Sequence, residues 1–101
     1  MTYPPIPSTV ETIGGAVRVV VVTALCDEDG AACWGLWVRS AREIRLAPLT
    51  PALQWATLFH ELHHVALDDS GLANLLSAKM QEALCDASAS ARMREQFVGP
   101  K

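Results

Sequence analysis

The stretch TPALQWATLFHELHHVAL, residues 50–67, has the clearest helix pattern in the chain. The Thr50 hydroxyl can accept a hydrogen bond from a free backbone N–H of the first turn, and Pro51 suits the first helical position. We therefore expect a helix from Pro51 to about Leu67, ended by the turn residues DDSG at 68–71. Apolar residues at helical spacing predict the side that faces the core: Leu58, Leu62, Val65 and Ala66.

Three short segments ahead of this helix have strand patterns. Residues 16–25 are rich in valine, residues 33–38 contain two tryptophans, and residues 43–46 alternate polar with apolar side chains. The links between these segments are short and contain turn-forming residues. Because short links join antiparallel strands most simply, we expect a small antiparallel three-stranded sheet.

A second helix is predicted from about Leu72 onwards, and it either reaches Phe97 or breaks near residues 88–90. Strands followed by helices, instead of alternating with them, indicate an α+β fold. We expect a flexible lead-in at 1–15, a single domain at 16–97 and a loose tail at 98–101. The apolar stripe of the second helix is predicted to contain Leu72, Leu75, Leu76, Met80, Ala83, Leu84 and Ala87.

The composition limits the classes of partner. The chain has 101 residues and a formal net charge of −3, and its Lys and Arg residues form no basic cluster, so no nucleic-acid partner is expected. The apolar run at 17–25 is far too short to cross a bilayer, so no membrane partner is expected either. Three cysteines without a disulfide spacing pattern indicate a reducing, cytoplasmic setting. The sequence gives no indication of the oligomeric state.

The first helix contains the pentapeptide HELHH, residues 60–64, which has the form H-E-x-x-H. His60 and His64 are four residues apart, so their side chains lie one above the other on a helix face. Two imidazoles placed this way can bind one Zn²⁺ ion at about 2.0–2.1 Å. Glu61 lies one residue round the helix, where it can act as the general base toward a water molecule. Five residues can form this pattern by chance, so a third ligand is needed to support it.

Among the downstream acids, Glu82 is the best candidate for the third ligand. Glu82 and Asp86 lie four residues apart beside the apolar stripe, where unpaired carboxylates are costly. We expect Glu82 to bind the metal and Asp86 to accept the N–H of a ligand histidine, as an outer partner of the site. The alternative is a solvated helix edge. A turn or a terminal position accounts better for the other acids, Asp68, Asp69 and Glu95.

HELHH followed by an E-x-x-x-D stretch at 82–86 resembles the pattern of gluzincins, the thermolysin-like zinc peptidases. Residues 42–89 are similar to ImmA/IrrE-type metallopeptidases, in which a strand precedes a T-x-x-H-E-x-x-H-like helix and a second helix carries an E-x-x-A-[ND]-x-F-A-like stretch. The size resembles minigluzincins, single-domain members of the same clan that can be latent. This resemblance implies a minimal zincin core, one Zn²⁺ per chain, and hydrolysis of a peptide bond in a protein or peptide substrate.

In this group the strand nearest the site helix pairs with an extended substrate. The resemblance therefore implies that residues 43–47 form an open edge, with Glu43 and Arg45 as possible substrate contacts. His63 replaces the usual glycine, and it either contacts substrate or is solvated. Cys85 replaces a small residue and is either a redox-sensitive neighbour of the metal or a small buried residue.

Three functions remain open from the sequence. The first is a zinc metallopeptidase that acts on a specific protein partner. The second is a latent or non-catalytic zinc-stabilised domain used for protein interaction, in which a terminal segment (residues 3–7 or 96–101) occupies the open metal position. The third is a metal-free interaction protein that uses Trp34, Trp37 and Trp55 as anchors, although tryptophans in a small domain are more often part of the core.

Overall fold

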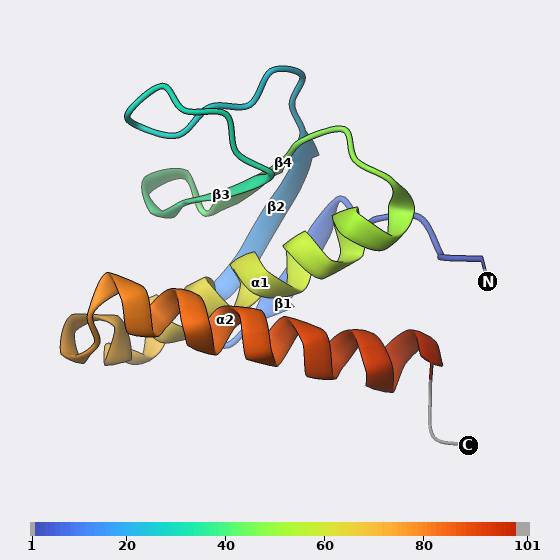
Figure 1. Cartoon of the computed structure of the whole chain (residues 1–101). Helices are drawn as coiled ribbons and strands as arrows, with labels where there is room; N and C mark the ends of the chain where they lie inside the picture. Colours follow the sequence, from blue (N-terminus) through green and yellow to red (C-terminus); the bar gives the residue numbers. More distant parts are fainter. Residues whose placement is uncertain (1, 99–101) are drawn as a thin grey trace.

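The computed structural model describes residues 2–98 and has one mixed four-stranded sheet with two long helices (Figure 1). The predicted α+β class is confirmed. Of the tail expected at 98–101, residues 99–101 lie outside the described residues.

The sheet differs from the predicted antiparallel meander. It contains β1 (Thr9–Thr12), β2 (Gly15–Val21), β3 (Gly35–Val38) and β4 (Glu43–Leu46), in the spatial order β1-β2-β4-β3. β4 is parallel to β2 and antiparallel to β3, so it lies inside the sheet and β3 forms an edge. The physical reason is burial: Ile44 and Leu46 of β4 are both fully buried, which requires neighbours on both sides.

The expected flexible lead-in contains strand β1, which pairs antiparallel with β2. Ile6 and Val10 pack against the core, and the Trp55 indole donates a hydrogen bond to the Pro4 carbonyl at 2.8 Å. The ring of Tyr3 lies edge-on to that of Phe97, with 5.0 Å between centroids. These contacts hold residues 3–12 against the domain.

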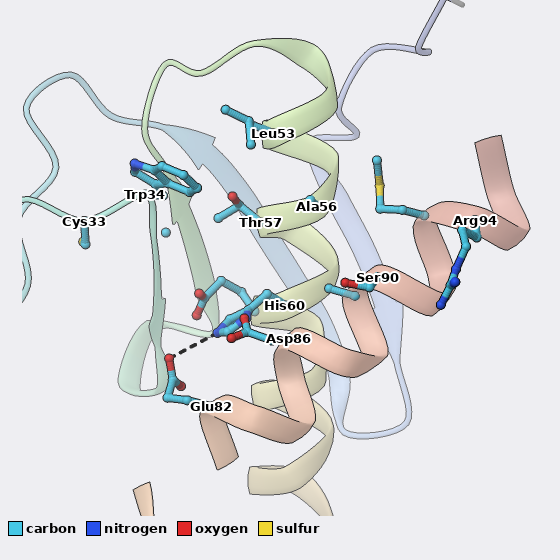
Figure 2. Close-up of a pocket in the computed structure, with 14 residues that line it drawn as sticks. Cys33, Trp34, Leu53, Ala56, Thr57, His60, Glu82, Asp86, Ser90 and Arg94 are labelled. Carbon is cyan, nitrogen blue, oxygen red and sulfur yellow. Dashed lines mark ion pairs between the residues drawn. The ribbon is translucent and has the colours of Figure 1, made fainter. Parts of the chain in front are cut away.

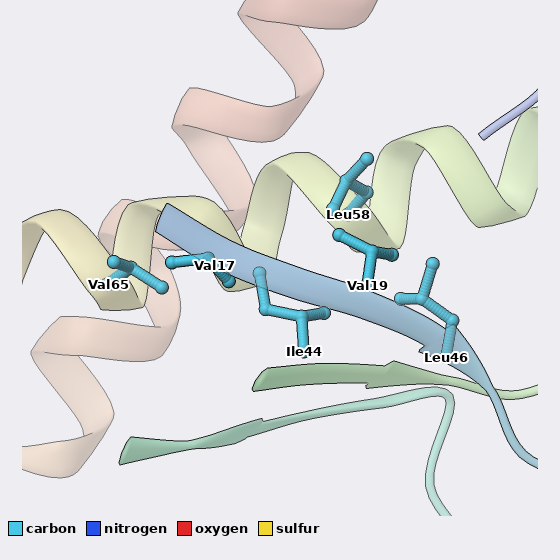
Figure 3. Close-up of a cluster of buried hydrophobic side chains, with 6 residues drawn as sticks. All are labelled: Val17, Val19, Ile44, Leu46, Leu58 and Val65. Carbon is cyan, nitrogen blue, oxygen red and sulfur yellow. The ribbon is translucent and has the colours of Figure 1, made fainter. Parts of the chain in front are cut away.

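The predicted first helix is confirmed as α1 (Pro51–Ser70), which begins where expected and ends three residues later than Leu67. The Thr50 side chain accepts a hydrogen bond from the Leu53 backbone N–H at 3.4 Å, and Gly71 ends the helix in the left-handed conformation. Leu58 and Val65 of α1 pack on the buried face of the sheet, as Figure 3 shows. The core cluster consists of Val17, Val19, Ile44, Leu46, Leu58 and Val65.

The second helix begins later than predicted and faces the core with a different side. A short 3-10 turn (Leu72–Leu75) precedes α2 (Ala78–Met93). α2 begins at Ala78 because the Ser77 hydroxyl caps it, accepting a hydrogen bond from the Met80 N–H at 3.1 Å. A turn over Arg94–Val98 continues α2, so the helix does not break near residues 88–90. Within α2 only Cys85 and Ala89 are buried, because these small side chains allow close approach to α1. Six of the seven residues of the predicted apolar stripe are exposed instead: Leu72, Leu75, Met80, Ala83, Leu84 and Ala87.

Candidate metal centre

Helix α1 places His60 and His64 one turn apart, with 5.0 Å between their ring centroids. Helix α2 places Glu82 opposite both rings. One Glu82 oxygen lies 3.4 Å from His60 Nε2, and the other lies 2.5 Å from His64 Nε2. Two nitrogen donors and one carboxylate, predicted from the sequence as one ligand set, therefore meet at one point between the helices.

Asp86 lies behind His60. Its Oδ1 is 2.8 Å from His60 Nδ1, and Figure 2 shows the carboxylate beside the ring. An N–H at Nδ1 that donates to Asp86 leaves His60 Nε2 with its lone pair facing Glu82. Two acceptors do not face each other at this distance unless a proton or a cation lies between them. The donor set and its orientation therefore fit a bound metal ion.

Glu61 lies in the interior beside these ligands, with only 7% of its surface exposed. Burial raises the pKa of its carboxyl group, and the nearby His60, His64 and the backbone N–H of Trp37 lower it in part. Gly35 of β3 lies against this carboxylate, because a Cβ at position 35 would be 3.3 Å from Glu61 Oε2. The same Cβ would lie only 2.5 Å from Thr57 Cγ2, so β3 lies too close to α1 for a side chain at this position unless one of the two elements shifts.

Cys85 is a further potential ligand. Its side chain is fully buried, and its Sγ and one nitrogen of each of His60 and His64 all lie within 4.8 Å of one another. Burial also raises the pKa of the thiol to about 12. The sequence left two interpretations of Cys85 open, and the structure places it in the side-chain cluster that contains both histidines.

A cavity of about 690 Å³ opens in front of His60, Glu61 and Glu82 (Figure 2). Its wall toward the start of α1 includes apolar side chains, while α2 supplies Ser90 and the turn after α2 supplies Arg94. The sequence analysis assigned no role at the metal site to several of the lining residues: Cys33, Trp34, Gly35, Leu53, Met93 and Arg94. The only sequence feature that could have pointed to these residues is Gly35, which lies between two tryptophans. A glycine inside a strand indicates that another part of the molecule approaches the backbone closely, but it does not indicate which part.

The expectation that residues 43–47 form an open edge is wrong. β4 is paired with β2 on one side and with β3 on the other, so its backbone N–H and C=O groups are already hydrogen-bonded within the sheet and cannot pair with a substrate. Glu43 is 8% exposed and accepts from Arg18 at 3.0 Å and from Arg45 at 2.7 Å. These ion pairs are typical of a sheet-stabilising carboxylate, so substrate contacts by Glu43 and Arg45 are not supported.

His63 does not line the cavity in front of His60. It lines a separate cavity of about 540 Å³ on another side of α1, together with Leu62, Ala66 and Arg92. The one-residue offset from His64 turns its side chain by about 100° around the helix, away from the metal ligands. A substrate contact by His63 is therefore not supported by its position.

No protein-family model, curated protein or solved structure matched this chain. Membership of the gluzincins, or of the ImmA/IrrE-type group within them, therefore stays a prediction that rests on the motif residues. Among residues 2–98, no helix is both long and apolar enough to cross a membrane.

Proposed function

We propose that this chain is a zinc-dependent metallopeptidase of the gluzincin type. His60, His64 and Glu82 hold one Zn²⁺, and Glu61 is the general base. The observation that carries the proposal is the meeting of both Nε2 atoms at the Glu82 carboxylate while Asp86 holds Nδ1 of His60. Three protein ligands leave one position open, as catalytic zinc sites require.

The chemistry divides between the ion and the chain. Zinc, when bound, acidifies water and polarises a carbonyl group. Glu61 then takes the proton of the attacking water and passes it to the leaving nitrogen, so that the peptide bond is cleaved with no net change in protonation of the carboxyl group. Its burial beside the ligands suits this role, because a buried carboxyl group binds a proton more readily than an exposed one.

The edge strand β3 is the surface that suits a peptide substrate. The Trp34 carbonyl accepts a hydrogen bond from the Ala47 N–H at 2.8 Å, so Trp34 is a hydrogen-bonded position of the ladder between β3 and β4. Because such positions alternate along an antiparallel pair, the N–H and C=O of Gly35 point away from β4, toward the free edge. An extended peptide that pairs with this edge would pass in front of Glu61. Trp34 and Leu53 favour an apolar substrate side chain at this place.

The decisive experiment compares metal content and hydrolysis in purified, tag-free protein. We expect one zinc per chain in the wild type and in Glu61→Gln, and less zinc in Glu82→Ala. Cleavage of an unfolded protein or of a peptide library should be lost in Glu61→Gln. Absence of zinc after reconstitution, or undiminished cleavage by Glu61→Gln, would contradict the proposal.

A non-catalytic zinc-stabilised interaction domain is the second candidate, and the position of Cys85 favours it. The structure does not support blockage of the site by the lead-in. Tyr3 packs on Phe97, and the Pro4 carbonyl accepts from Trp55, so this segment is held away from the cavity.

A further inference from the structure

The candidate metal centre has a potential ligand on each of two sides. The Glu82 side chain is 58% exposed, so this carboxylate reaches the histidines from the solvent side. The Cys85 side chain is fully buried and reaches them from within the contact between α1 and α2. Residues three apart share a helix face, so one face of α2 offers both an oxygen and a sulfur ligand to the same pair of imidazoles.

The thiol lies close to bonding distance. Around a tetrahedral zinc ion, nitrogen and sulfur ligands are about 3.6 Å apart, given bond lengths of about 2.1 Å and 2.3 Å. The Cys85 Sγ and the histidine nitrogens lie within 4.8 Å of one another before any ion draws them together. Helix packing alone does not require sulfur at this position, because the next buried residue of the same helix face is Ala89.

We propose that Cys85 is a fourth zinc ligand, which closes the site in the isolated chain. This inference rests on the proposed metal centre and adds the regulation of that centre. The Cys85 thiol loses its proton to solvent as the sulfur binds the ion, and no oxidant or reductant is needed. Four protein ligands are typical of a structural zinc site and leave no position for water. The isolated chain therefore hydrolyses peptides slowly, because a water molecule reaches the ion only while the Cys85 sulfur is detached from it.

Cobalt substitution tests this directly, because a thiolate bound to Co²⁺ adds a near-ultraviolet charge-transfer absorption that nitrogen and oxygen ligands do not. We expect this absorption in the wild type and in the double variant Cys26→Ser/Cys33→Ser, in which Cys85 is the only thiol. Cys85→Ser should lose it while keeping the visible Co²⁺ bands. Cys85→Ser should also release zinc more readily and cleave peptides faster than the wild type.

The outcomes separate this inference from the proposed function. Bound Co²⁺ without the charge-transfer absorption in the wild type would overturn the role of Cys85 and leave the peptidase proposal standing. Loss of the absorption in Cys26→Ser/Cys33→Ser, with Co²⁺ still bound, would also overturn it. Failure of the wild type to bind Co²⁺ or Zn²⁺ would overturn both proposals. The spectra of the wild type and of Cys26→Ser/Cys33→Ser together decide the question even if Cys85→Ser folds poorly.

Discussion

The Nδ1 atom of His60 lies 2.8 Å from Oδ1 of Asp86, although the two residues belong to different helices and are 26 positions apart. This contact sets the direction in which the other ring nitrogen points. Because the partner of a ligand histidine fixes its tautomer and orientation, Asp86 should affect metal binding without touching the metal.

Asp86→Asn should therefore lower zinc affinity by about 10–100-fold while the fold is retained. The amide keeps the shape of the side chain but removes the charge that holds Nδ1–H. Competition with a chromophoric chelator measures the affinity. Asp29→Asn, at an exposed turn acid, is the matched control and should bind zinc like the wild type. Equal affinities in the two variants would rule out a positioning role for Asp86.

Gly35→Ala should destabilise the contact between β3 and α1. The new Cβ would lie 2.5 Å from Thr57 Cγ2 and 3.2 Å from Glu61 Cγ, so one of the elements must move. Overpacking of this kind typically costs about 1–3 kcal/mol, and it would also displace Glu61. Urea unfolding measures the first effect and peptide hydrolysis the second. Thr57→Ser removes the Cγ2 methyl group, so the double variant should regain part of the lost stability; no recovery would show that the clash lies elsewhere.

Leu58→Ala should lower the free energy of unfolding by about 2–5 kcal/mol, because Leu58 is 1% exposed in the core between α1 and the sheet. Leu75→Ala is the matched control. Its side chain is 79% exposed, so its effect should stay within about 0.5 kcal/mol. Chemical denaturation of both variants also tests the observed orientation of the second helical segment. A large loss in Leu75→Ala would support the apolar stripe expected from the sequence instead.

The Arg42–Asp69 ion pair should make stability depend on acid pH. The two terminal guanidinium nitrogens lie 2.9 Å and 3.0 Å from the Asp69 oxygens, and hydrogen bonding from Arg42 lowers the pKa of the carboxyl group below its ordinary value. Because the pKa of Asp69 is lower in the folded state than in the unfolded state, the ion pair stabilises the fold at pH values above the ordinary pKa of an aspartate. This contribution is lost as the pH falls through the lowered pKa of the folded state.

Asp69→Asn should therefore lose less stability than the wild type when the pH falls below about 4. Urea unfolding in the presence of a chelator measures this without interference from metal binding. Glu95→Gln serves as the control and should follow the wild type. Parallel pH profiles of wild type and Asp69→Asn would show that the ion pair contributes nothing measurable.

The two aspartates that end α1 show how far local reasoning reaches. The sequence analysis explained Asp68 and Asp69 as turn residues. In the structure, however, Asp68 accepts a hydrogen bond from the Trp37 indole at 2.6 Å and Asp69 holds Arg42. Both partners lie about 30 residues earlier in the chain. A turn pattern indicates that a helix ends, but it does not indicate which distant donors its acids meet.

Local interactions are what the sequence determined by itself. The cap at Thr50, the α1 helix and the four-residue spacings of His60/His64 and Glu82/Asp86 depend on neighbours within one or two turns, so the pattern alone was enough to predict them. The tertiary structure decided the central position of β4, the free edge of β3, the face that α2 turns inward and the place of Cys85 beside the histidines. These features depend on which apolar surfaces of distant segments bury one another best in the folded chain. The spacing of apolar residues within a single segment does not determine which distant surfaces it packs against.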